Sequence, residues 1–167
     1  MSDAALPWRE LDSDTCSIAR TMAVLGEPWT VLVVRDLLNG VRRFDDLVAH
    51  LGIARTVLSR RLTVLAEAGL VETAEYREPG RRAHREYRPT AACRDLRPVL
   101  LSLLAWGDRH RAGPDGPPVV VRHDGCGAPV ELVAECAAGH RLALDDPRDR
   151  MRTTPGPGAR PAPRADR

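Results

Sequence analysis

A mainly α fold with a small β hairpin (α+β) is predicted by three observations in the middle of the chain. Three leucines recur at the i, i+4, i+7 spacing with which an amphipathic helix buries one face: Leu58, Leu62 and Leu65. Gly69 then ends the helix, because glycine tolerates the left-handed conformation of a C-terminal cap. Two loosely alternating stretches, 70–77 and 85–88, lie on either side of a Pro-Gly turn and are predicted to pair as strands. A helix followed directly by such a hairpin is typical of a winged helix-turn-helix domain.

Two further helices are predicted before this region. The first covers residues 16–25, with Asp14 or Thr15 as its N-cap. The second covers residues 29–38, which are nearly all apolar and, taken alone, also fit a buried strand. A helix is favoured because an Asn-Gly pair follows the run and an Arg-Asp pair interrupts it at helical spacing.

The helix-turn-helix itself follows a short extended link. Asp45 is predicted to cap a helix over 46–51, and Gly52 makes the turn into a second helix over 54–68. The polar face of the second helix carries arginine and hydroxyl side chains and no acid before Glu67. Such a helix presents its N-terminal residues to base edges in the major groove of DNA. The predicted contacts of this part are Arg43, Arg55, Thr56, Ser59 and Arg60.

The hairpin over 71–88 is the predicted wing, and its turn is loaded with cations. Arginine presents a planar fork of donors that suits phosphate. These side chains would bind the DNA backbone or minor groove and add salt-dependent affinity with little sequence preference. The predicted wing contacts are Arg77, Arg81, Arg82 and Arg85. The opposing interpretation for each is a solvated surface charge, and for Arg61, which leans toward the core, neither interpretation is preferred.

The composition allows one domain of ordinary size with an appendage. Of the 167 residues, 43% are hydrophobic and 4% aromatic, so the core is built mostly from Leu, Val and Ala. A net charge of +2 is too small to identify a nucleic-acid partner, and any basic patch must be local. The sequence contains no lysine, so all of its Lys and Arg residues are arginine. The codon bias of a GC-rich genome is the favoured explanation for this composition.

The location of the protein is inferred from the absence of targeting features. The N-terminal residues lack a basic segment followed by an apolar one, and no apolar run is long enough to cross a bilayer. Four cysteines in a chain of this length do not make a disulfide framework. We expect a cytoplasmic protein with reduced thiols and no membrane partner.

The motifs of enzymes are missing from the sequence. His84 and Glu86 imitate the His-x-Glu of zinc deaminases, but no Pro-Cys-x2-Cys follows. There is no Gly-rich phosphate loop, nucleophile elbow or His-Glu-x2-His helix. An enzyme is therefore excluded, and the competing hypothesis is a winged-helix protein-interaction adaptor without sequence-specific DNA binding.

The region after the wing begins with a long helix. Thr90 is predicted to cap it, it reaches about residue 111, and Pro98 must kink or restart it. Its apolar stripe is broad and consists of Leu96, Val99, Leu100, Leu103, Leu104 and Trp106. Dimerisation through this stripe is favoured over packing within the chain. The predicted divisions are an N-terminal arm, 1–14, the winged domain, 15–112, a linker, 113–118, a small β-rich module, 119–146, and a disordered tail, 147–167.

Several motifs resemble the HxlR-type regulators, which are winged-helix relatives of the MarR group. They occur in the right order and spacing over roughly residues 15–108. They are Cys16-Ser17-Ile18-Ala19, Gly26-Glu27-Pro28-Trp29-Thr30, Arg42-Arg43-Phe44-Asp45-Asp46-Leu47, Leu58-Ser59-Arg60-Arg61-Leu62, Glu67-Ala68-Gly69-Leu70-Val71, Glu86-Tyr87 with Thr90, and Leu96-Arg97-Pro98-Val99-Leu100 with Trp106-Gly107. The resemblance implies a homodimeric bacterial transcription factor whose helix 54–68 reads the major groove and whose hairpin 71–88 touches phosphate or minor groove.

The expected partners are double-stranded operator DNA and a second copy of the chain. We expect no cofactor to be required for DNA binding. Repression is favoured over activation, because nothing in the sequence resembles an activator surface. No residue identifies a small-molecule or oxidant effector, the operator or the regulated genes.

Cys16 occupies the place of an N-terminal cysteine that senses oxidants or electrophiles in some members of the resembled family. A sensing thiol must be exposed and must have thiolate character. The opposing interpretation, a small core residue, is slightly favoured. The partner cysteine of disulfide-switching members is missing, since residues 45–53 contain none, and Cys93 is the only candidate left inside the domain.

The appended module has the spacing of a small zinc ribbon. His123-x2-Cys126 and Cys136-x3-His140 are two pairs of zinc-ligand types about nine residues apart. The module also resembles a tail of some family members with a second Cys-x2-Cys-Gly motif, in which Gly139 here replaces the last cysteine. His140 substitutes for it, or the metal is lost and a hairpin is held by its valines and leucine. Such a zinc site would be structural.

Overall fold

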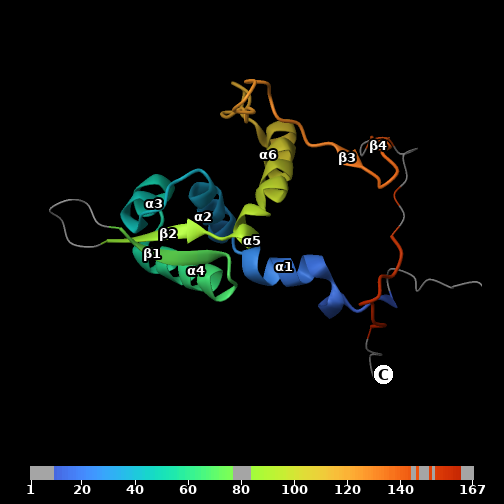
Figure 1. The fold of residues 1–167 in the computed structure, drawn as a ribbon, viewed down its shortest axis with the longest axis horizontal. Helices are drawn as coiled ribbons and strands as arrows, with labels where there is room; N and C mark the ends of the chain where they lie inside the picture. The colour runs from blue at the N-terminus through green and yellow to red at the C-terminus, as the bar shows by residue number, and fades with distance from the viewer. Residues whose placement is uncertain (1–9, 77–83, 144–145, 147–150, 152, 163–167) are drawn as a thin grey trace, which may run out of the picture. The chain divides into compact units, whose positions relative to one another are not determined.

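The computed structural model describes residues 10–76, 84–143, 146, 151 and 153–162 (Figure 1). The chain divides into two compact units, the first made of residues 1–94 with 152–167 and the second of residues 95–151. This division differs from the predicted winged domain over 15–112, because it assigns the last helix of that range to the second unit. Helices with a small antiparallel hairpin make up the first unit, as the predicted fold class requires.

Helix α2 (Pro28–Leu38) is the centre of the first unit and contacts α1, α3, α4, α5 and β2. Pro28 lies in its first turn, where the fixed φ of proline suits a helix start. The helix is confirmed over the alternative of a buried strand, and its buried face includes Val33, Val34 and Leu37.

Helix α1 (Ser17–Leu25) begins one residue later than predicted, with Cys16 as its N-cap. The predicted caps, Asp14 and Thr15, are wrong, because both lie in a preceding 3-10 turn, η2 (Ser13–Thr15). Asp12 caps that turn instead, and its Oδ1 accepts a hydrogen bond from the amide of Asp14 at 2.9 Å. The capping carboxylate is therefore that of Asp12, and it caps the 3-10 turn before α1 and not α1 itself.

The helix-turn-helix consists of α3 (Phe44–Leu51) and α4 (Arg55–Glu67). Gly52 joins them with φ +63°, which confirms the predicted glycine turn. The N-cap of α3 is Arg43 and not the predicted Asp45, because Arg43 is held extended by its pairing with β2. Asp45 lies in the first turn of α3, where a carboxylate stabilises the helix dipole.

The wing is an antiparallel pair, β1 (Val71–Tyr76) with β2 (His84–Pro89). In Figure 1 the hairpin lies beside α3 and α4, and its strands contact both helices. A short third segment joins it, since Arg43 bridges Glu86 and the amide of Tyr87 donates to the carbonyl of Arg42 at 2.8 Å. The tip, residues 77–83, lies outside the described residues.

The predicted long helix after the wing is two helices, α5 (Ala91–Arg94) and α6 (Arg97–Arg111). Thr90 caps α5, because its Oγ1 accepts from the amide of Cys93 at 3.3 Å. Pro98 lies in the first turn of α6. Of the two outcomes expected for this proline, a kink or a restart, the structure shows the restart.

The appended module contains the short hairpin of β3 (Ala134–Glu135) and β4 (Arg141–Leu142). An isolated bridge joins Arg122 to Pro129. The tail differs from the expected disorder at residues 160–162. There the amide of Asp12 donates to the carbonyl of Arg160 and the amide of Ala162 to that of Glu10, each at 2.8 Å. Backbone pairing of this kind needs no apolar periodicity, so the sequence gives no signal of it.

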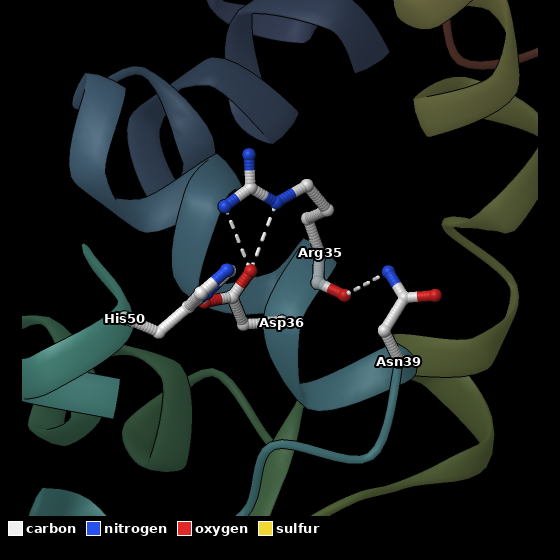
Figure 2. A network of polar contacts seen from close by, with 4 residues as sticks. All are labelled: Arg35, Asp36, Asn39 and His50. Atoms are coloured by element: carbon white, nitrogen blue, oxygen red, sulfur yellow. Dashed lines mark hydrogen bonds and ion pairs between the residues drawn. The ribbon is translucent and has the colours of Figure 1, made fainter. Parts of the chain in front are cut away.

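One buried carboxylate interrupts the apolar core of the first unit (Figure 2). Asp36, on α2, is 2% exposed. Its Oδ1 accepts from Nε and Nη2 of Arg35 at 2.9 and 2.8 Å, and its Oδ2 lies 2.6 Å from Nδ1 of His50 on α3. Both partners point toward the carboxylate from more exposed positions (Figure 2). The contact therefore ties α3 to α2.

Replacing His50 by alanine is expected to lower the free energy of unfolding. The carboxylate oxygen that faces His50 would lose its partner while Asp36 stays buried, and an unsatisfied buried polar group costs about 1–3 kcal/mol. His50→Gln keeps a donor and should lose less. Urea unfolding of the full chain measures both variants, and equal losses would show that the hydrogen bond contributes nothing.

Candidate nucleic-acid interface

The orientation of α4 is fixed by its apolar side chains. Leu58, Leu62 and Leu65 are buried, at 0%, 3% and 0% exposure. The polar residues of the opposite face are therefore directed outward, and all four are exposed: Thr56, Ser59, Arg60 and Thr63. The hydroxyl of Thr63 donates a hydrogen bond to the carbonyl of Ser59 at 3.1 Å. The other three side chains are left for an external partner.

The two neighbouring arginines of α4 have different environments. Arg60 is exposed and forms no ion pair with the described residues. Arg61 is 11% exposed, its Nη1 lies 3.9 Å from the carboxylate of Glu27, and its Nε is buried without a partner among the described residues. Arg61 is thus a largely buried residue and belongs to the packing of the domain, whereas Arg60 faces solvent.

Arg55 lies at the start of α4 and already has partners. Its Nη1 is 2.6 Å from Oδ1 of Asp45, and its guanidinium lies over the ring of Phe44 at 4.8 Å from the centroid. Both members of the ion pair are exposed. Exposed pairs contribute only about 0–1 kcal/mol to stability, so Asp45 holds Arg55 weakly. This pair is not among the sequence predictions, although the opposite charges on either side of the Gly52 turn indicate it.

The described part of the wing carries one of the predicted contacts. Arg85 is exposed on β2, opposite Glu75 in the strand register. Arg77, Arg81 and Arg82 lie outside the described residues. Arg43 is placed at the base of the wing by its bridge to β2. Its neighbour Arg42 is also exposed there. The pairing of Arg42 and Arg43 with β2 was not predictable from the sequence, because a segment of two residues shows no alternation of polar and apolar side chains.

The two cysteines of the domain lie in different surroundings. Cys16 is half-buried at the N-cap of α1. Cys93 is fully buried, and burial raises the pKa of its thiol, an effect that the charge of Arg94 partly opposes. A buried thiol with a raised pKa is a poor nucleophile. Cys93 is therefore ill suited as the partner of Cys16 in a disulfide switch.

The predicted metal ligands form two separate pairs. Nδ1 of His123 lies 3.3 Å from Sγ of Cys126, and Nδ1 of His140 lies 3.6 Å from Sγ of Cys136. Within the described part of the chain, no three His, Cys, Asp or Glu residues are grouped closely enough to hold a metal ion. Among the same residues, no helix has the length and apolar character of a membrane span.

Comparison with known proteins decides the family. Residues 24–114 match the HxlR-like helix-turn-helix family. The chain belongs to this family. It is similar to the uncharacterised HTH-type transcriptional regulator Rv3095 of Mycobacterium tuberculosis, with 38% identity over 143 residues, 85% of this chain and 87% of that protein. The resemblance inferred from the sequence motifs is confirmed.

Two solved structures share this fold over most of the chain. PA1607 matches with a TM-score of 0.72 and 32% identity, over 83% of this chain and 94% of its own. PA1374 of Pseudomonas aeruginosa matches with a TM-score of 0.58 and 38% identity, over 85% of this chain and 93% of its own. The HxlR-like chain is thus a transcriptional regulator with a helix-turn-helix DNA-binding domain, and it is not an enzyme.

Alkylation of the native chain is expected to spare Cys93. Burial excludes the reagent, and the raised pKa keeps the thiol protonated near neutral pH. Iodoacetamide labelling in the presence of EDTA, which keeps the thiols free of metal, followed by peptide mass spectrometry should modify exposed Cys126 first, and Cys93 only after unfolding in urea. Labelling of Cys93 in the native protein as fast as that of Cys126 would contradict the buried environment.

Proposed function

We propose that this HxlR-like regulator is a dimeric, sequence-specific DNA-binding repressor. In this proposal α4 enters the major groove and the wing lies on the backbone or in the minor groove. The observation that carries it is the outward face of α4, where the buried leucines hold Thr56, Ser59 and Arg60 exposed together. Arginine can pair with two acceptors of guanine, while hydroxyl side chains bond to either base edges or phosphate.

The electrostatics of α4 also suit DNA. No acidic residue occurs between Arg55 and Ala66. The N-cap, Ala54, offers no capping side chain, so the first-turn amides have no side-chain acceptor. Amides at a helix N-terminus attract phosphate through hydrogen bonds and the helix dipole. Backbone contacts there would fix the register, and Arg60, one turn further along, would reach a base.

Exposed apolar side chains on two helices support the proposed dimer. On α1, Ile18 and Met22 lie one turn apart and are 70% and 51% exposed. On α6, Val99, Leu103 and Trp106 share one face at i, i+4, i+7 spacing and are also exposed. Apolar faces of this kind on a single chain are typical of interaction surfaces, and a second copy would cover them.

Repression is the simpler mode of action for such a protein. A dimer that occupies a promoter blocks polymerase by its presence alone, whereas activation needs an additional contact surface. The arginine-rich wing favours DNA over the alternative of a protein-binding adaptor, because an adaptor would not need a cluster of cations there.

Fluorescence anisotropy on DNA from upstream of the regulator's own gene tests the proposal. The reduced full chain is titrated at two salt concentrations against this DNA and a scrambled duplex. Tight, selective binding that weakens with salt is expected, because each phosphate contact adds about −0.9 to the logarithmic salt slope. Binding to neither DNA at low salt would overturn the proposal in favour of the adaptor.

Arg60→Ala is expected to act differently from a paired change in the wing. Loss of one bidentate base contact should cost about 1–3 kcal/mol on the operator and relax base choice there. Arg81→Ala with Arg82→Ala should weaken both duplexes alike and flatten the salt slope by about 2, one for each lost phosphate contact. Arg109→Ala on α6 is the control. Wild-type binding by both test variants would show that the interface lies elsewhere.

Leu103→Glu is expected to convert the dimer to monomers. A charge buried without a partner costs more than the 1.4 kcal/mol that changes an equilibrium tenfold, so the dimer dissociation constant should rise at least about tenfold. Ala105→Glu, on another face of α6, should leave the dimer intact. Sedimentation equilibrium measures both, and an unchanged Leu103→Glu dimer would exclude α6 from the interface.

A further inference from the structure

The appended module is folded without a core of its own. None of its described residues from 119 to 143 is buried, and its two strands have two residues each. Its apolar side chains remain exposed: Val119, Val120, Val130, Leu132 and Val133. A segment of this size cannot bury enough apolar surface to be stable and usually needs a disulfide, a metal or a partner. The module therefore lacks a component that holds it together.

Two tight turns in this module each bring a histidine to a cysteine. In the first, the amide of Gly127 donates to the carbonyl of His123 at 2.7 Å, and Gly127 has φ +71°. In the second, the amide of Gly139 donates to the carbonyl of Cys136 at 2.9 Å. The amide of Cys136 also donates to the carbonyl of His140 at 3.0 Å, which closes the second turn.

The space beside His123 depends on a glycine. A Cβ on Gly125 would lie 2.9 Å from Cε1 of the imidazole, which is closer than a side chain tolerates. The absence of a side chain at this position lets the ring fold back over its own turn toward Cys126. In the second turn Gly139 has φ +82°, a conformation that a cysteine would rarely adopt. His140, and not residue 139, is thus the side chain that faces Cys136.

The distances within the two pairs fit two ligands of one metal ion. Zinc binds thiolate sulfur at about 2.3 Å and imidazole nitrogen at about 2.0–2.1 Å, and a tetrahedral angle between them separates the two atoms by about 3.6 Å. The Nδ1–Sγ distances are 3.3 Å for the first turn and 3.6 Å for the second. Each turn therefore presents half of a tetrahedral site with two nitrogen and two sulfur ligands.

We propose that the module binds one zinc ion through His123, Cys126, Cys136 and His140. The two turns are separate in the described structure, so binding requires the segment between them to close and bring the pairs onto one ion. Each cysteine loses its proton to solvent on binding, and the two thiolates neutralise the charge of Zn²⁺. Four protein ligands complete the coordination shell, so the site is structural and has no position for a substrate.

The role of the ion is to replace the missing core. Ligands that are far apart in the unfolded chain become joined, so the free energy of metal binding stabilises the folded module. This inference concerns only residues 119–146 and does not rest on DNA binding by α4. A failure of one proposal leaves the other standing.

Metal analysis of the full chain tests the site. After exhaustive dialysis against metal-free buffer, elemental analysis should find one zinc per chain. Replacement by Co²⁺ should give the intense visible absorption of a tetrahedral site and thiolate-to-metal charge transfer in the near ultraviolet. Less than stoichiometric zinc, or a weak octahedral cobalt spectrum, would overturn the proposal. The wild-type spectrum gives this result even where a variant fails to fold.

Ligand substitutions show whether both turns bind the same ion. His123→Ala, Cys126→Ser, Cys136→Ser and His140→Ala should each raise the zinc dissociation constant more than about 100-fold, beyond the 10–100-fold effect of outer-shell changes. Cys16→Ser, a cysteine outside the module, is the matched control and should bind like wild type. Loss of zinc on changing one turn but not the other would overturn the four-ligand site. So would a metal-dependent doubling of mass with half a zinc per chain, which indicates a site shared between two copies.

Discussion

The carboxylate of Asp36 constrains the packing of the first unit, because it is a buried polar group in α2, the helix that contacts α1, α3, α4, α5 and β2. Burial of a carboxylate is costly unless hydrogen bonds and opposite charge offset its lost hydration. Arg35 supplies two donors from the same helix, and His50 supplies the contact from α3 (Figure 2). Satisfying the acid therefore fixes where α3 lies on α2. Since only Gly52 and two further residues separate α3 from α4, the position of α3 also restricts the start of α4.

Apolar packing fixes the orientation of α4, whose start the polar contact restricts. The leucine stripe of α4 allows one rotation of the helix about its axis, and that rotation exposes Arg60 while burying Arg61. Adjacent residues of the same type thus have opposite roles, one in contact with solvent and one in the packing of the domain. The distinction comes from the 100° step between successive residues on a helix and needs no difference in chemistry.

The sequence predicted those features that depend on local spacing. The leucine stripe, the glycines at positions 52 and 69, and the strands of the wing follow from periodicity and turn chemistry, and the structure has them. Contacts between distant residues were not predictable in this way: Asp36 meets His50 across 14 positions, and Arg55 meets Asp45 across 10. The cap of α3 was missed for a related reason, because the pairing of Arg43 with β2 sets its first turn. Local sequence propensity does not depend on a pairing partner that is distant in the sequence.

Thr90 joins three parts of the domain through one hydroxyl group. Its Oγ1 donates to the carbonyl of Gly69, just after α4, at 2.8 Å and accepts from the amide of Cys93 in α5. The end of α4, the base of the wing and α5 therefore meet at a single side chain. Any event that displaces α5 would therefore disturb the end of α4 and the base of the wing at the same time, so in the proposed DNA complex both contacts would weaken together.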